Sequence, residues 1–296
     1  MAVGDLRRIS MELNIVILVL ASAMLHPMWN LLIKKNPDPQ LGFLCLTILF
    51  GLSALIHGLW AGVDFSAIFT ALPLIAVSIL GQLLYGNSLI ATLKRGDLST
   101  YYPIIRASPV FVVAFSMIFL GKSYALIILF GITLVVAGGY LLLYRRGTSI
   151  FKDPAALGFA LIAMSGSGIY SLSDAQLMQT ITPQALALAV ETTIIPVYVI
   201  RWYRQRNTDD TFLTHANLNG VTYLILPGII AYSSYYLILL SYQYGADVAS
   251  VTSLRQASIP ISVALGGLFL REGAMARRFF AASILAFGIV LISVNG

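Results

Sequence analysis

Two arginines lie inside apolar segments of this sequence. Arg106 occurs in YYPIIRASPVF, residues 101–111, with no acidic residue within eight positions on either side, and Arg255 occurs in VTSLRQASIPI, residues 251–261. A guanidinium on a helix at the bilayer centre costs from about 3 to more than 10 kcal/mol if it faces lipid. We therefore expect both side chains to line a wet cavity and bind an anionic group. The alternative is structural: each forms an ion pair with Glu191 or Asp174, or caps backbone carbonyls beside a proline.

Two acidic residues also lie within apolar segments, Glu191 in ALAVETTIIP and Asp174 in IYSLSDAQL. A buried carboxyl can carry a proton in a coupled transport cycle. Both residues are therefore candidates for proton coupling, and Glu191 is equally a candidate ion-pair partner for an arginine. The sequence leaves these two roles open.

Further polar side chains recur at helical spacing in the other apolar segments. The tyrosines could stack on a cation or on the apolar body of a substrate, or they could pack and hydrogen-bond locally. Together with the two arginines, the predicted substrate-binding residues are His26, Trp29, Asn30, Tyr85, Tyr102, Tyr232, Tyr235 and Gln256.

The composition indicates the elements that must position these side chains. The chain has 296 residues, of which 58% are hydrophobic and 10% charged, and its mean hydropathy is +0.87. Soluble domains are about one quarter charged, so this composition is typical of a membrane protein. The net charge of +6 comes from basic residues between the apolar segments, which we interpret as topology signals rather than as a nucleic-acid site. A single cysteine, Cys45, excludes a disulfide framework within the chain.

Ten apolar segments are long enough to cross a hydrocarbon core, which needs roughly 20 residues per helix. The connections between them are short, and none has room for a soluble domain. The predicted spans are 14–34, 40–61, 67–93, 98–120, 124–144, 154–178, 183–202, 218–242, 248–270 and 274–294.

An internal repeat relates the two halves of the chain. With a shift of 150 residues, identical residues coincide at Asp97 and Asp247, at Ser108 and Ser258, and at Gly138 and Gly288. We therefore predict two five-helix units, residues 1–147 and 148–296. Because five is odd, the second unit enters the membrane from the opposite side, which gives the inverted repeats typical of secondary transporters. Most basic residues lie in the odd-numbered connections, which predicts those connections in the cytoplasm and both termini outside.

The fourth and ninth predicted helices carry the arginines and have their own local signals. Asp97 and Asp247 precede these helices and are predicted N-caps. Prolines near the arginines predict bends, because proline removes a helical hydrogen bond. These prolines are Pro103, Pro109 and Pro260.

The sequence resembles the drug/metabolite transporter superfamily, specifically its EamA-like ten-helix carriers. The resemblance covers nearly the whole chain and is carried by FLGKSYALIILFGITLVVAGGYLLL and FLREGAMARRFFAASILAFGIVLI, which resemble the end of each EamA repeat. That pattern usually has Gly-Glu after the fourth and ninth helices. Here Glu272 keeps the acid, whereas Lys122 stands in its place in the first copy.

We therefore expect an all-α membrane protein that carries a small polar metabolite by alternating access. An amino acid or related carboxylate is the leading substrate class, since a zwitterion could use an arginine and Glu191 together. A phosphonate or other organic anion is the alternative, and an uncoupled channel is a third. No phosphate-binding loop, metal motif or catalytic triad spacing stands out, so we expect no enzyme and no cofactor. The expected location is a bacterial inner membrane.

Overall fold

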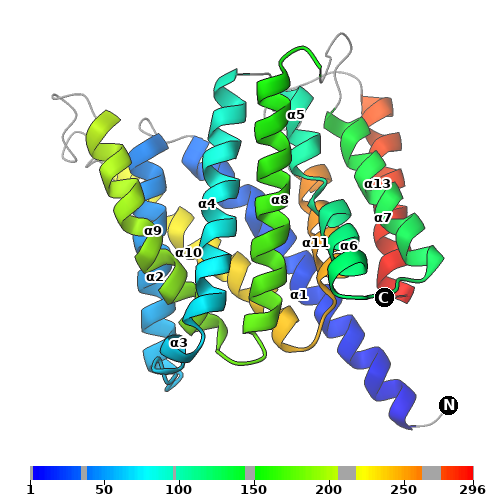
Figure 1. Cartoon of the computed structure of the whole chain (residues 1–296), viewed down its shortest axis with the longest axis horizontal. Coiled ribbons are helices and arrows are strands. Elements are labelled where there is room, and N and C mark those ends of the chain that lie inside the picture. Colours follow the sequence, from blue (N-terminus) through cyan, green and yellow to red (C-terminus); the bar gives the residue numbers. More distant parts are fainter. Residues whose placement is uncertain are drawn as a thin grey trace.

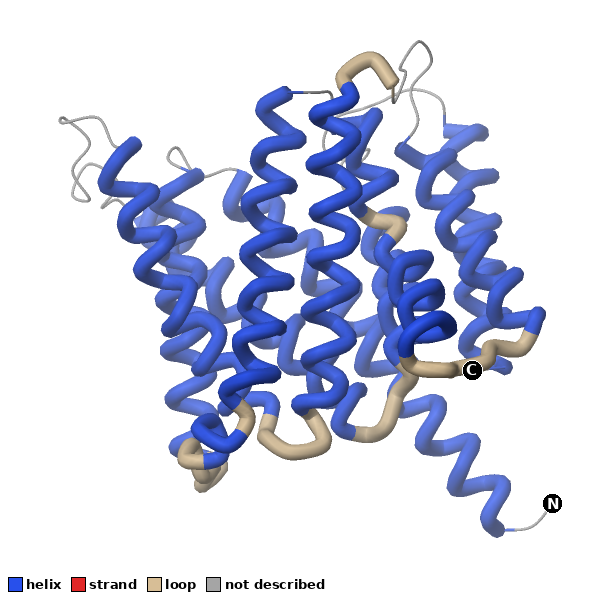
Figure 2. The backbone as a smooth tube through the Cα atoms, in the orientation of Figure 1, coloured by secondary structure: helices blue, strands red, loops and turns tan. Residues whose placement is uncertain are grey.

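The computed structural model describes residues 3–34, 39–95, 98–143, 151–205, 218–261 and 275–295. In these ranges the chain folds only into helices and loops (Figures 1 and 2). The long helices lie side by side in one bundle, with their connections at its two ends. The described connections that follow α2, α6, α8 and α10 lie at the same end as both termini, at the bottom of Figure 1.

Each predicted segment contains at least one described helix, and residues 262–270 of the ninth segment lie outside the described residues. Their bounds are α1 Val3–Lys34, α2 Pro39–Trp60, α3 Ala67–Thr70, α4 Leu72–Arg95, α5 Leu98–Ile105, α6 Ser108–Phe119, α7 Leu126–Leu143, α8 Pro154–Leu177, α9 Pro183–Gln205, α10 Leu218–Gln243, α11 Val248–Leu254, the 3₁₀ helix η2 Arg255–Ala257, and α13 Met275–Asn295. Helical backbone resumes after η2 at residues 258–261.

Seven spans in the described residues are long and apolar enough to cross a bilayer, and two shorter apolar helices, Leu126–Leu142 and Phe280–Ile292, accompany them. The chain is therefore an α-helical, multi-pass membrane protein. Most of the predicted bounds that fall on described residues lie within a few residues of the observed ones, and two differences are larger. The first helix begins at Val3 rather than at residue 14, and the segment 67–93 divides at Ala71 into α3 and α4.

Aspartates cap two helices whose first turns are described. The Asp247 carboxylate accepts hydrogen bonds from the backbone N–H groups of Ala249 and Ser250, at 2.9 and 3.2 Å, which confirms the predicted cap of α11. Asp153 caps α8 in the same way. The predicted cap at Asp97 lies outside the described residues.

The fourth predicted span is broken at Arg106. α5 ends at Ile105 and α6 begins at Ser108, and the break is the short tan segment within the bundle in Figure 2. Pro109 has no N–H to donate to the Ile105 carbonyl, and the next residue, Val110, bonds to the Ala107 carbonyl at 2.9 Å in a tighter turn. The predicted bend is therefore an interruption of the helix.

The ninth predicted span also departs from α-helical geometry at its arginine. α11 ends at Leu254, and Arg255–Ala257 form a 3₁₀ turn before the helix resumes. Each arginine therefore lies at the point where its own helix departs from α-helical geometry.

Glycines allow the closest helix contacts. α4 packs along α8, and a methyl group added at Gly81 would lie 2.7 Å from the Tyr170 amide nitrogen. One added at Gly166 would lie 2.6 Å from the Tyr85 amide nitrogen. These contacts bring the backbones of α4 and α8 together near Tyr85 and Tyr170. α7 and α13 make a similar contact at Gly138 and Gly288.

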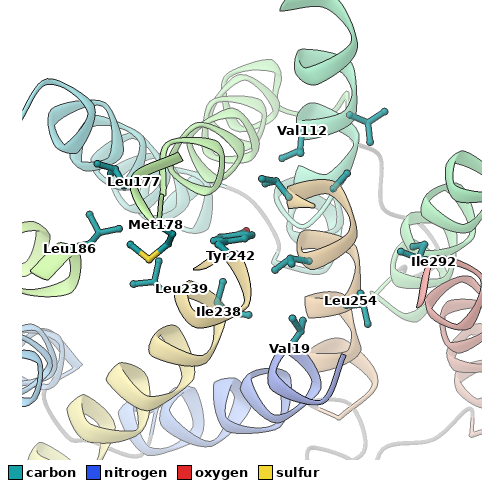
Figure 3. Close-up of a cluster of buried hydrophobic side chains, with 14 of the residues drawn as sticks. Val19, Val112, Leu177, Met178, Leu186, Ile238, Leu239, Tyr242, Leu254 and Ile292 are labelled. Carbon is teal, nitrogen blue, oxygen red and sulfur yellow. The ribbon is translucent and has the colours of Figure 1, made fainter. Parts of the chain in front are cut away.

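The apolar core joins elements from both halves of the sequence. Figure 3 shows Val19 of α1, Val112 of α6 and Leu254 of α11 together with Leu177 and Ile238, and all five are buried. Burial of such side chains contributes about 1.5–3 kcal/mol each relative to leaving them in water. Because lipid is also apolar, tight packing rather than exclusion from water selects this arrangement within a bilayer.

Candidate functional site

Six helices bring polar side chains to one place inside the bundle, which we name the central polar cluster. His26 interacts electrostatically with both Arg106 and Arg255, and Tyr85 interacts with both arginines and with two further tyrosines. The cluster consists of His26 from α1, Tyr85 from α4, Tyr102 and Arg106 from the α5 break, Tyr170 and Asp174 from α8, Tyr235 from α10 and Arg255 from η2.

Arg106 connects the two broken helices. Its Nη2 donates a hydrogen bond of 2.5 Å to the Ser258 hydroxyl, and that hydroxyl donates to the Arg255 carbonyl at 2.8 Å. The Arg106 guanidinium carbon lies 6.0 Å from the centre of the Tyr102 ring. Its Nε is buried and has no hydrogen-bond partner. Arg106 is therefore held in place by neutral groups and keeps one donor for a further acceptor.

Arg255 is surrounded by tyrosines. Its guanidinium interacts electrostatically with Tyr170, Tyr242 and Tyr235 and lies within hydrogen-bonding reach of the Tyr170 hydroxyl. Neither Arg255 nor Arg106 forms a salt bridge with a described acidic residue. The predicted alternative of direct ion pairs with Glu191 or Asp174 is absent from this part of the chain.

Asp174 is the acid that the fold places beside the arginines. It is 1% exposed, and its two carboxyl oxygens accept hydrogen bonds from different hydroxyls, Ser78 at 2.5 Å and Tyr235. Arg255 acts on it electrostatically without a direct ion pair. These two hydroxyl donors, from α4 and α10, fix the position of the carboxyl group.

Glu191 lies away from this cluster. It sits on α9, which packs against α2, and its β-carbon would be 3.4 Å from a methyl group added at Gly51. The side chain is 8% exposed, its Oε2 has no hydrogen-bond partner, and it acts electrostatically on Tyr198. The structure does not bring Glu191 together with either arginine.

The other predicted binding residues divide between the cluster and its edges. Gln256 is 4% exposed, donates to the Thr252 carbonyl at 3.0 Å, and has a buried Oε1 without a partner. Trp29 lies edge-on to His26, with ring centres 5.0 Å apart. Asn30 is exposed and donates to the His26 carbonyl of its own helix.

Tyr232 belongs to a separate aromatic group that the sequence did not predict. Its hydroxyl lies 2.7 Å from Nδ1 of His57, whose ring is 4.8 Å from the Tyr236 ring and 6.4 Å from the Trp60 ring. In the sequence His57 is one polar residue near the end of an apolar segment, and no spacing signal connects it to Tyr232. We therefore separate Tyr232 from the central polar cluster.

A small crevice adjoins Arg106. It lies between α5, α7 and η2, has a volume of about 10 Å³, and includes Arg106, Gln256 and Tyr140 among its lining residues. Arg106 and Gln256, each of which has a buried polar atom without a partner, thus line the same crevice. Among the described residues no group of three His, Cys, Asp or Glu side chains could hold a metal ion.

The fold occurs in a solved structure. A protein described only as "Crystal structure of protein" matches this chain with a TM-score of 0.76, covering 96% of this chain and 98% of its own, at 17% sequence identity. At that identity the similarity shows the fold alone. No protein-family model and no curated protein matches the sequence.

Proposed function

We propose that this chain is a secondary carrier of a small organic anion, most simply a carboxylate, that works by alternating access between two inverted five-helix repeats. The single observation that carries the proposal is the meeting of Arg106 and Arg255 in one half-buried cluster inside the bundle, each at the break of its own helix and neither in an ion pair with a described acid. Broken helices with charged groups near the bilayer midplane are the usual form of a transporter binding site.

The helix contacts support the inverted repeat. If the predicted repeats 1–147 and 148–296 exchange places, α4 takes the position of α10 and α8 takes that of α1. The α4–α8 contact then corresponds to the α10–α1 contact, and both contacts are extensive. The same exchange maps the α2–α9, α7–α13 and α6–α11 contacts onto themselves. In a ten-helix protein with this pattern, each half can adopt the conformation of the other. The inward-open and outward-open states then have similar energies. It is also the arrangement implied by the resemblance to EamA-like carriers.

The placement of the acids bears on the substrate. A zwitterionic amino acid would need a carboxylate on the protein beside the arginines, and Glu191, the residue first expected there, lies elsewhere. Asp174 is present, but Ser78 and Tyr235 already occupy both its oxygens. These contacts favour a ligand recognised through its anionic end, either the carboxylate of an amino acid or related compound, or a phosphonate.

Binding and counterflow assays test this function. Purified protein is screened by thermal shift against carboxylates, amino acids, phosphonates and quaternary amines, and the strongest binder is used for counterflow in liposomes at equal pH. A carrier gives saturable uptake that rises when unlabelled compound is present on the far side. An uncoupled channel conducts without that stimulation, and preferential binding of quaternary amines would contradict the anion site.

A further inference from the structure

Two residues that line the same crevice each have a buried polar atom without a hydrogen-bond partner. The atoms are Nε of Arg106 and Oε1 of Gln256, and the crevice lies between α5, α7 and η2. Buried polar atoms without partners are uncommon in folded proteins, because leaving one unpaired is costly. Two of them on residues of one crevice point to a polar group that the folded chain does not itself supply.

The hydrogen-bonding character of both atoms is fixed. The Gln256 amide donates through Nε2 to the Thr252 carbonyl at 3.0 Å, and a rotated amide would set two acceptors against each other. Oε1 is therefore the free end of the amide, and it can only accept. Nε of an arginine carries a hydrogen and can only donate. A group that partners both atoms must accept one hydrogen bond and donate another.

The crevice limits the size of that group. Its volume of about 10 Å³ has room for about one water-sized group, and its lining residues other than Arg106, Gln256 and Tyr140 are apolar. A hydroxyl group has this size, and it both accepts and donates. An ammonium group only donates, a carboxylate only accepts, and a methyl group does neither.

Arg106 also belongs to the anion site of the proposed function. Its Nε is part of the same planar guanidinium that would hold a carboxylate. A hydroxyl group that accepts from Nε would therefore lie beside that carboxylate, on the neighbouring carbon of the ligand. We infer that the protein recognises 2-hydroxycarboxylates and that Gln256 is the residue that selects the hydroxyl group. The inference rests on the proposed function, and it names the substrate class.

Lactate, propionate and alanine differ only in the group on the carbon next to the carboxylate. Lactate carries a hydroxyl group there, propionate a hydrogen, and alanine an ammonium group at neutral pH. Their affinities for the full-length protein in nanodiscs are measured at neutral pH by calorimetry and by ligand-induced thermal shift. We expect lactate to bind at least about tenfold more tightly than propionate, because propionate leaves both protein atoms unpaired. Lactate should also bind more tightly than alanine, whose ammonium group cannot accept from Nε.

Gln256→Met keeps the length of the side chain and removes the acceptor. It should reduce the preference for lactate over propionate to less than about threefold, while propionate still binds. Gln184→Met is the matched control, because Gln184 is 6% exposed and lies beside His57, outside the crevice. It should keep the wild-type preference. Val136→Leu leaves both polar atoms in place but adds a methylene group to the crevice wall, and it should weaken the binding of lactate selectively.

The outcomes separate this inference from the function beneath it. If the wild type binds none of the three ligands and no phosphonate, the anion site of the proposed function is wrong, and the inference is wrong with it. If only phosphonates bind, or if lactate and propionate bind equally, the inference alone is overturned. Tighter binding of alanine than of lactate, or an undiminished preference in Gln256→Met, overturns it in the same way.

Val136→Leu decides the matter if Gln256→Met fails to fold. Loss of the preference for lactate in Val136→Leu, with propionate still bound, would support the inference. An unchanged preference in that variant would contradict it.

Discussion

The guanidinium of Arg106 donates a hydrogen bond to the hydroxyl of Ser258 across the two interrupted helices. The two residues are 152 positions apart and belong to different predicted repeats. Ser258 in turn donates to the carbonyl of Arg255, so one serine connects the breaks in both spans. A ligand that takes the Arg106 guanidinium as partner would act directly on the contact between the two halves.

Ser258→Ala should destabilise the protein by about 1–2 kcal/mol, because it removes a hydrogen-bond acceptor from a charged group. Ser253→Ala is the matched control. Ser253 is fully buried, but its hydroxyl bonds only to the Ala249 carbonyl of its own helix, and such bonds add little to helix stability. Unfolding in a mixed-micelle denaturant series measures both. Equal losses in the two variants would show that the Arg106 contact contributes nothing.

Gly166→Ala should lower stability by roughly 1–3 kcal/mol, because its new methyl group would overlap the backbone of α4 at Tyr85 and Gly81. Gly158→Ala in the same helix meets nothing within 4 Å and should be neutral or slightly stabilising, since alanine favours helix. Thermal midpoints of the purified variants make the comparison. A Gly166→Ala protein as stable as Gly158→Ala would contradict the close α4–α8 packing.

The Lys122–Asp247 salt bridge, at 2.8 Å, joins the loop after α6 to the start of α11 at the end of the bundle that holds the termini. Burial alone would lower the pKa of Lys122, but the hydrogen bond and charge of Asp247 outweigh it and raise the pKa above its ordinary value of 10.5. The stabilisation is therefore complete below that value and is lost as the pH rises through the raised pKa.

Lys122→Met should accordingly destabilise by at most about 1 kcal/mol at neutral pH, because the pair is half exposed and screened by solvent. The difference from wild type should vanish in strongly alkaline solution and shrink in high salt. Thermal midpoints across a pH series test this. A difference that persists unchanged at alkaline pH would mean that the lysine acts through packing rather than through its charge.

Glu191 remains a candidate for proton coupling. Its carboxyl oxygen Oε2 is buried and has no hydrogen-bond partner. It can exchange a proton without breaking a hydrogen bond at Oε2. Uptake by Glu191→Gln should therefore lose its response to an imposed pH gradient, while counterflow at equal pH continues. A response equal to that of the wild type would remove Glu191 from the mechanism.

The sequence predicted the all-helical membrane fold because the signals for it are local. Apolar runs of sufficient length gave the spans, and Asp247 could be recognised as a cap from its position before an apolar segment. The bends beside Pro109 were also predictable, since the missing N–H of proline is a property of one residue.

The site was only partly predictable, because contacts between distant helices leave no trace in one sequence. Arg106 and Arg255 could be recognised from the sequence because a charged side chain within an apolar span has a high free-energy cost in a bilayer. That Asp174 rather than Glu191 lies beside Arg255 depends on how α8, α9 and η2 pack. The pairing of His57 with Tyr232 was missed for the same reason.

Counterflow by Arg106→Ala tests the central claim most directly. The anion that binds best to the wild type is loaded into liposomes that contain either Arg106→Ala or the control Arg95→Ala. Arg95 lies at the end of α4, over the Phe159 ring. Loss of one charged contact with the ligand should lower affinity about tenfold or more. We predict that saturable uptake is lost in Arg106→Ala and kept in Arg95→Ala. Full saturable uptake by Arg106→Ala would contradict the account.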